Sequence, residues 1–206
     1  MILSDPTGAV QGLVELIGSL LEVDLDRYGK TVRVMHINQA IGEMAQTTDF
    51  PFDNFVDTSP ALTGTEISLA SITAGRMIIR VKTIVDDTSE LGAVLPDELS
   101  GDSGEAPTAF THYGMSLFLD GDASLLSNPK ITGRSKPVVL VNNTDENLWT
   151  QYLPYAVAYK ACSIASVWLV EEERAIVFNQ LLAEVLHGAT VEYMMDVEET
   201  QSLESL

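Results

Sequence analysis

The sequence predicts an α+β chain, in which a helical bundle of two N-terminal and two C-terminal helices carries a central β-strand insert. Apolar residues recur at helical spacing at first, the period changes at Asp49, where an extended connection (49–64) precedes strand-like runs, and helical spacing returns near Asp145. At 206 residues the chain suits a single domain. Its predicted parts are N-terminal helices (1–48), a β insert with acidic loops (49–143), a C-terminal helix pair (144–195) and an acidic tail (196–206).

Two helices are predicted in segment 1–48. The first begins after Pro6 and Thr7, and a second helix follows a turn at 24–26 and covers residues 25–46. Apolar residues of the first stand three or four positions apart: Val10, Leu13, Val14, Ile17, Leu20 and Leu21. The second presents an amphipathic face: Tyr28, Val32, Met35, Ile41 and Met44.

The middle of the chain predicts strands. Runs at 65–70 and 76–85 are rich in apolar and β-branched residues, 108–122 indicates a hairpin that turns near Gly114, and 136–143 indicates one further strand. Pro, Gly and Ser throughout 86–107 indicate a loop.

Helical spacing in the last third begins with a short helix, capped by Asn143 or Thr144, that ends near Trp149. Pro154 fits the first turn of a second helix that ends near Trp168, because a proline there loses no hydrogen bond. Acidic residues 171–173 open the final long helix, where they complement its positive end. Its predicted packing stripe comprises Ala175, Phe178, Leu182, Val185 and Ala189.

The net charge argues against nucleic acid as a bound partner. Lys and Arg number 11 against 30 Asp and Glu, which gives a formal net charge of −19 at pH 7. Phosphate backbones bind clustered positive charge, so this balance repels them. The plainest role of the acids is solubility.

Known catalytic and metal-binding motifs are missing from the sequence, and the three histidines stand alone in their segments. Segment 120–131 begins like a calcium loop but has Leu125 and Ile131 where such loops need Gly and Glu, so it predicts a turn. The single cysteine, Cys162, excludes an internal disulfide and is predicted to be a buried apolar residue. We expect no enzyme, no metal and no cofactor, although a soluble enzyme of unrecognised type stays open as an alternative.

No signal peptide is recognisable, and the longest lysine-free apolar run, 161–170, is too short to cross a bilayer. We therefore expect a soluble protein of a reducing cytoplasm, or part of a particle assembled there.

Charge is segregated along the chain. No Lys or Arg lies between Lys82 and Lys130, whereas nine acids do. This pattern fits a solvated surface, or a ring in which acidic and basic faces of neighbouring copies meet. The acids singled out for an acidic surface loop are Asp86, Asp87, Asp97, Glu98 and Asp102.

Three segments, which together cover about a third of the chain, resemble the head-to-tail adaptor (connector) proteins of tailed bacteriophages, including the tail tubular A type. They are "VRVMHINQAIGEMA" at 32–45, "APTAFTHYGMSLFL" at 106–119, and "ENLWTQYLPYAVAYKACSIASVWLVEEERAIVFNQLLAEVL" at 146–186. The chain departs from the family in its longer acidic loop, 86–105, and in its low arginine content.

The resemblance implies a single adaptor domain that forms a homo-oligomeric ring, typically a dodecamer, in the neck of the virion. Its partners would be copies of itself, the portal protein and a downstream tail or nozzle protein. DNA would pass through without specific binding, along the acidic loop residues, and no membrane would be involved. A tail-completion or tube-terminating protein is the alternative from the same particle.

Two sets of residues are candidates for contacts under this resemblance. The set expected at a subunit interface, or in the core, comprises Trp149, Tyr152, Tyr155, Tyr159, Trp168 and Phe178. The set expected to dock on the portal comprises Val197, Leu203 and Leu206.

Overall fold

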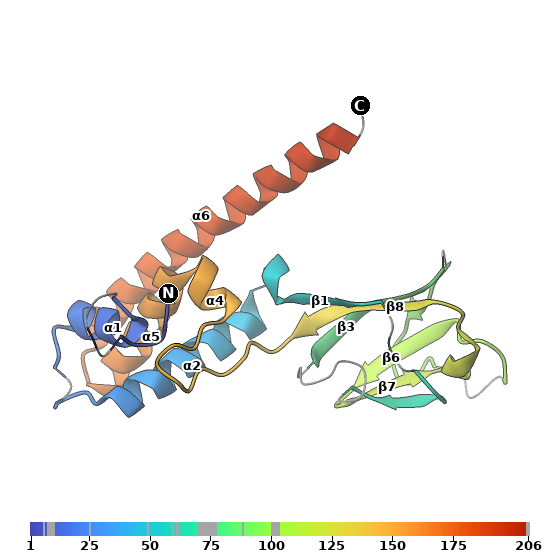
Figure 1. Ribbon diagram of the computed structural model, residues 1–206, viewed down its shortest axis with the longest axis horizontal. Coiled ribbons are helices and arrows are strands. Elements are labelled where there is room, and N and C mark those ends of the chain that lie inside the picture. Colours follow the sequence, from blue (N-terminus) through green and yellow to red (C-terminus); the bar gives the residue numbers. More distant parts are fainter. Residues whose placement is uncertain are drawn as a thin grey trace. The chain divides into compact units, whose positions relative to one another are not determined.

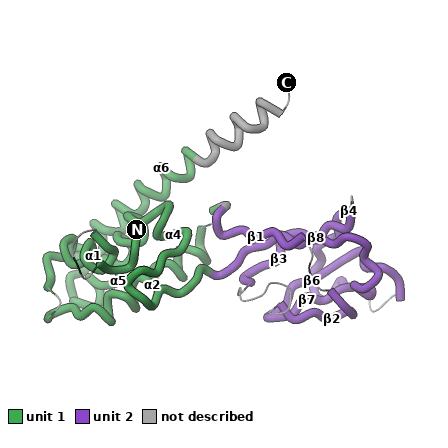
Figure 2. The backbone as a smooth tube through the Cα atoms, viewed as in Figure 1, with its two compact units in different colours: residues 1–50, 137–206 green, residues 51–136 purple. Residues whose placement is uncertain are grey.

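The computed structural model describes residues 1–206 except 6, 8–10, 25, 49, 59, 61, 70–77, 88, 100–103, 205 and 206; for residue 51 and residues 193–204 it describes the backbone alone. The chain forms two compact units (Figure 1 and Figure 2). Unit 1 comprises residues 1–50 and 137–206, and unit 2 comprises residues 51–136.

The predicted fold class, a helical bundle with one central β insert, is wrong. The described residues form a mixed α and β structure with five α-helices and two sheets of four strands each. The physical reason is that the middle of the chain holds enough inward-facing apolar residues to build a core of its own between two sheets.

Unit 1 is helical and is organised around α5. The helices are α1 (Leu13–Leu21), α2 (Lys30–Thr47), α4 (Leu148–Tyr152), α5 (Pro154–Trp168) and α6 (Glu172–Glu204). Small residues on α5, among them Ala158, Ala161 and Ala165, are fully buried and let α1, α2 and α6 all pack against this helix.

The short helix α4 is held by a capping box. The Asn147 side chain accepts from the N–H of Thr150 at 3.1 Å, and the Thr150 hydroxyl accepts from the N–H of Asn147 at 3.1 Å. Trp149 is fully buried, with its ring edge-on to Phe50 at 5.6 Å between centroids. Pro154 then opens α5 at its first turn, as predicted.

Arg33 of α2 is buried and binds three backbone carbonyls. Its guanidinium donates to the oxygens of Tyr28 (2.7 Å), Val14 (2.9 Å) and Val23 (2.7 Å), which belong to α1 and the α1–α2 connection. A Cβ at Gly18 would collide with this guanidinium, so α1 needs a glycine where Arg33 crosses it. Burial lowers the pKa of Arg33, and the carbonyl oxygens satisfy the charge in place of water.

Unit 2 consists of two sheets. The first has the order β1 (Asn54–Asp57), β8 (Pro129–Ser135), β3 (Ile78–Asp86), β4 (Ser89–Glu90), and is antiparallel throughout. The second has the order β2 (Glu66–Ser68), β7 (Ser116–Leu119), β6 (Ala109–Tyr113), β5 (Gly92–Ala93), and only its β5–β6 pair is parallel. Two short 3-10 turns, at Pro51–Asp53 and Ala123–Leu125, complete the unit.

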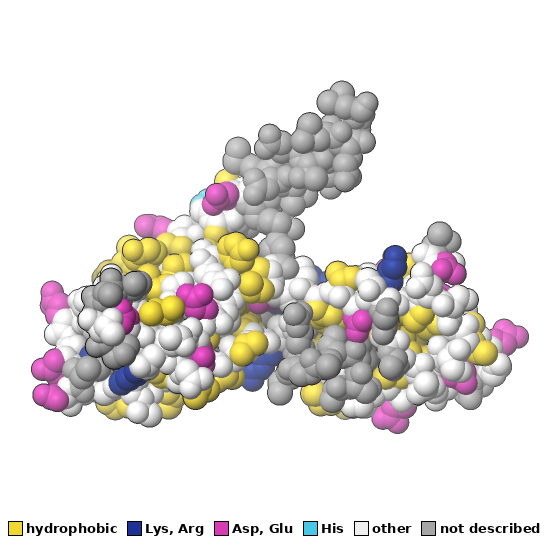
Figure 3. Space-filling view, viewed as in Figure 1, with side chains coloured by type: hydrophobic (Ala, Val, Ile, Leu, Met, Phe, Trp, Pro, Cys, Tyr) yellow, Lys and Arg dark blue, Asp and Glu magenta, His cyan; other side chains and the backbone are white. Residues whose placement is uncertain are grey.

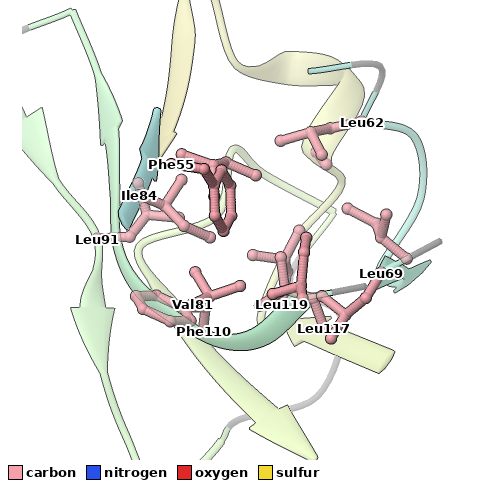
Figure 4. Packing of buried hydrophobic residues seen from close by; sticks show 13 residues of the cluster. Phe55, Leu62, Leu69, Val81, Ile84, Leu91, Phe110, Leu117 and Leu119 are labelled. Atoms are coloured by element: carbon pink, nitrogen blue, oxygen red, sulfur yellow. The ribbon is translucent and has the colours of Figure 1, made fainter. Parts of the chain in front are cut away.

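The two sheets share one apolar core (Figure 4). Phe55 and Ile131 enter it from the first sheet and Leu117 enters it from the second. Each such side chain contributes about 1.5–3 kcal/mol when it is fully buried. A Cβ at Gly133 would collide with the backbone oxygen of Arg80 and lie 2.8 Å from the ring of Phe55, so only glycine lets both approach β8 this closely.

Two details of the predicted β segment are also wrong. The last strand is β8 at 129–135, and the predicted strand 136–143 is irregular, with Val138, Val139 and Val141 exposed. The predicted loop 86–107 contains β4 and β5, which are two residues each and too short to leave a periodic pattern.

Gly18→Ala is expected to destabilise the protein by about 1–3 kcal/mol, although alanine favours helices, because Arg33 must leave its carbonyl partners. Gly42→Ala is the matched control. It also lies inside a helix, but its added Cβ would meet nothing within 4 Å, so it should stabilise by about 0.5–1 kcal/mol. Urea unfolding followed by circular dichroism measures both, and equal effects would contradict this account of Gly18.

Asp120→Asn is expected to remove an acid-sensitive contribution to stability. Burial raises the pKa of Asp120, but donors from the Ala109 N–H (3.0 Å), the Thr108 hydroxyl (2.7 Å) and the Thr108 N–H (2.8 Å) lower it further than burial raises it. An aspartate with a lowered pKa stabilises the fold fully above its unfolded value, near pH 4, and this contribution is lost as pH falls through the folded value.

The native chain should therefore be more stable than Asp120→Asn by about 1–3 kcal/mol at neutral pH, and the gap should close as pH falls through the lowered pKa of Asp120. Thermal melts across pH measure this difference. Asp97→Asn, at an exposed side chain, should follow the native chain at every pH.

Candidate interaction surface

Three titratable side chains, Tyr28, His36 and Cys162, are buried in the interior of unit 1. His36 Nδ1 lies 2.6 Å from the buried Tyr28 hydroxyl, and burial lowers the pKa of His36. Burial also raises the pKa of Cys162 to about 12, so its thiol stays protonated at neutral pH and is a poor nucleophile. Within the described part of the chain, no three His, Cys, Asp or Glu side chains gather where they could hold a metal ion.

The six aromatic residues predicted for an interface or the core divide into two groups. Trp149 and Phe178 are buried, and half-buried Tyr159 lies between Tyr155 and Phe178, with ring centroids 6.3 and 6.4 Å apart. Three others are open to solvent: Tyr152 is 65% exposed, Tyr155 51% and Trp168 52%. The exposed group is the part available for contact with another molecule.

Tyr152 and Tyr155 form part of an apolar surface at the start of the helix pair. Leu148 precedes Tyr152 by four residues and so lies on the same side of α4, and it is also exposed. Tyr155 follows directly after Pro154, at the beginning of α5. We call Leu148, Tyr152 and Tyr155 the α4–α5 surface.

A second apolar surface lies at the turn between α5 and α6. Val167, Trp168 and Val170 are all more than half exposed, and Val170 reaches 84%. We call these three residues the α5–α6 surface. The ring centroid of Trp168 lies 5.8 Å from that of Tyr28 and 6.2 Å from that of His36. One part of this side chain therefore contacts the core of unit 1, while the other part is open to solvent.

Val170 holds the turn in an unusual conformation. The N–H of Glu171 bonds to the oxygen of Ser166 at 2.8 Å and the N–H of Val170 to that of Val167 at 3.1 Å, which is the Schellman pattern. Val170 occupies the left-handed position of that motif, with φ 63°. Glycine is usual there, and a β-branched residue is strained. This position is not visible in the sequence, because only the backbone angle reveals it.

Hydrophobic side chains gather in patches on the face of unit 1 that Figure 3 presents. Large aromatic side chains are enriched where proteins associate. The two apolar surfaces therefore make unit 1 the best candidate for contact with another protein.

The predicted acidic loop is partly structural. Asp87, Asp97 and Glu98 are exposed, whereas half-buried Asp86 accepts from the N–H groups of Ser127 (3.2 Å) and Asn128 (2.7 Å). Asp102 lies outside the described residues.

The last helix is longer than α5, against which it packs. α6 has 33 residues and α5 has 15, lengths of about 50 and 22 Å respectively. On its predicted stripe Ala175 and Phe178 are buried, while Leu182, Val185 and Ala189 are half-buried, so coverage decreases toward the C-terminus.

α6 continues into the segment predicted as an acidic tail and ends at Glu204. Val197 and Leu203 belong to this helix, although their side chains are not among those described. Leu206 lies outside the described residues.

Comparison with protein-family models finds no family that matches the chain, and comparison with characterised proteins finds no related sequence. The adaptor resemblance thus stays a prediction that rests on the three segments quoted above. Among the described residues, no helix combines the length and apolar character needed to cross a bilayer.

Val170→Gly is expected to stabilise the protein by about 1 kcal/mol, because glycine adopts positive φ without strain and the lost side chain is exposed. Val167→Gly is the matched control, since the same change inside α5 should destabilise by about 1 kcal/mol. Thermal melting measures both variants, and a destabilised Val170→Gly would mean that the Val170 side chain makes a contact that outweighs the strain.

Proposed function

We propose that this protein is a structural head-to-tail adaptor of a tailed bacteriophage. It forms a ring beneath the portal, joins the capsid to the tail in the neck of the virion, and frames the channel through which the genome leaves. The support is the resemblance of three segments to that family, in the expected order, together with the apolar surfaces of unit 1. The role is non-enzymatic and needs no cofactor.

The observation that carries the proposal is the exposure of Tyr152, Tyr155 and Trp168 on a helical unit whose other described large aromatics are buried or, at Tyr159, half-buried. Side chains of this kind are depleted from a freely solvated surface and are buried at the centres of interfaces. A ring gives each copy two neighbours, so separate surfaces on one unit can both be covered.

The charge of the chain suits a channel for DNA. With a net charge of −19, the walls of the ring repel the phosphate backbone and let it slide. The exposed loop residues Asp87, Asp97 and Glu98 are the proposed channel-facing acids. The C-terminal part of α6 would dock on the portal, and a downstream tail or nozzle protein would bind the opposite side of the ring.

The test compares two tyrosine variants at matched exposure. Tyr152→Ser with Tyr155→Ser should abolish ring formation, whereas Tyr113→Ser, which alters a 70% exposed tyrosine of unit 2, should leave it intact. Mass photometry over a concentration series counts the subunits, and circular dichroism confirms folding. Trp149→Ala is unsuitable because that side chain is part of the core.

Twelve-fold particles seen by electron microscopy would support the adaptor. Six-fold rings would favour a tube-terminating protein instead. A native chain that stays monomeric at every concentration and in the presence of portal complexes would overturn the proposal.

A further inference from the structure

Strand β8 carries a basic row on its outer face. Residues Lys130, Thr132 and Arg134 of the strand, and Lys136 directly after its end, alternate with Ile131 and Gly133, which face the core. Successive side chains of a strand point to opposite faces, so alternate residues of the row share one face and follow at about 6.6 Å along the strand. Both Lys130 and Lys136 are exposed.

Strand β3 adds a further cation to this face. Arg80 pairs directly with Arg134 across the two strands, and like charges in that arrangement repel. Arg134 lies 3.9 Å from buried Asp53, which offsets one of the two charges. Arg80 is exposed, and no ion pair joins it to a carboxylate of the described residues. Only 12% of the Arg134 side chain is exposed, so the cations that this face offers to a partner are Arg80, Lys130 and Lys136.

One exposed acid borders these cations, because Glu90 of β4 pairs with Val85, which in turn pairs with Lys130. Between the cations, the hydroxyls of Thr83 and Thr132 bond to each other at 2.6 Å, and Val56 pairs with Thr132 from β1. We call Arg80, Lys130, Arg134 and Lys136 the basic face. These four residues are more than a third of the 11 lysines and arginines of a chain whose net charge is −19.

An acidic helix of the chain itself has the charge that the basic face requires. Residues 175–206, which follow Arg174, hold six acids and no Lys or Arg. Glu184 and Glu192 of α6 are exposed. Nucleic acid is the less favoured occupant, because the large negative charge of the whole chain opposes its approach.

We propose that the basic face of one copy binds the acidic α6 of a second copy. This contact rests on the proposed ring and names one of its interfaces. It is heterologous, since two different surfaces meet, and repetition of such a contact around an axis closes a ring. The apolar surfaces of unit 1 supply burial, and this contact sets which neighbour binds and in which direction.

The experiment uses two complementary charge reversals of the full chain. Arg80→Glu with Lys130→Glu makes the basic face acidic, and Glu184→Lys with Glu192→Lys makes α6 basic. Each variant alone should assemble at least about tenfold more weakly than the native chain. An equimolar mixture should assemble again, because each reversed face then meets a partner of opposite charge on the other variant.

Arg27→Glu is the matched control for Arg80→Glu. Arg27 is also exposed, at 64% of its side chain, and its 3.7 Å ion pair with Glu171 lies on the surface of unit 1, where such pairs contribute little. It should leave assembly unchanged. Native assembly should also weaken as salt rises from about 0.1 to 1 M, where the screening length falls from about 10 to 3 Å.

Each outcome decides a different point. Native rings that both charge-reversed variants still form would overturn this contact and leave the proposed function standing. A native chain that never oligomerises would remove both. Binding of a fluorescent DNA duplex by the native chain, lost in Arg80→Glu with Lys130→Glu, would overturn the contact in favour of nucleic acid.

Discussion

The helical unit depends on one buried cation. Arg33 gathers the carbonyls of Val14, Val23 and Tyr28 and thereby fixes α1 and its connection against α2. Its guanidinium lies 5.3 Å from the centre of the Tyr28 ring, and that ring contacts Trp168. Arg33 contacts Tyr28, and Tyr28 contacts Trp168 at the end of α5. The buried arginine therefore helps to position the exposed α5–α6 turn.

The inner and outer faces of the first sheet of unit 2 carry different kinds of residue. The facing surfaces of its sheets form a closed apolar core, and this leaves the outer face of the first sheet free to carry charge. A central strand can hold alternating cations only because its other residues are small or apolar and satisfy the core. The apolar residues that stabilise unit 2 and the cations of the proposed contact are therefore separated by the two-residue period of one strand.

Strong helical periodicity made most of unit 1 predictable, including the first turn of α5 at Pro154. Strand β8 was not predicted, because proline and glycine are uncommon inside strands and the contacts that require Gly133, from the Arg80 backbone and the Phe55 ring, come from residues far away in the sequence. Of the candidate surface, the exposed tyrosines could be named from the sequence, but their separation from buried Trp149 could not. The pairing of Arg80 with Arg134 needs strand register, which no local pattern contains.

The order in which the chain is synthesised has a consequence for its two units. Unit 2 is one continuous segment, whereas unit 1 is made from both ends of the sequence. As the polypeptide leaves the ribosome, all residues of unit 2 are available before α5 has been synthesised. Until then α1 and α2 lack the helix against which they pack. Until then their apolar faces stay open to chaperones or to other nascent chains, so a pause in translation after residue 136 would expose the protein to aggregation through its N-terminal helices.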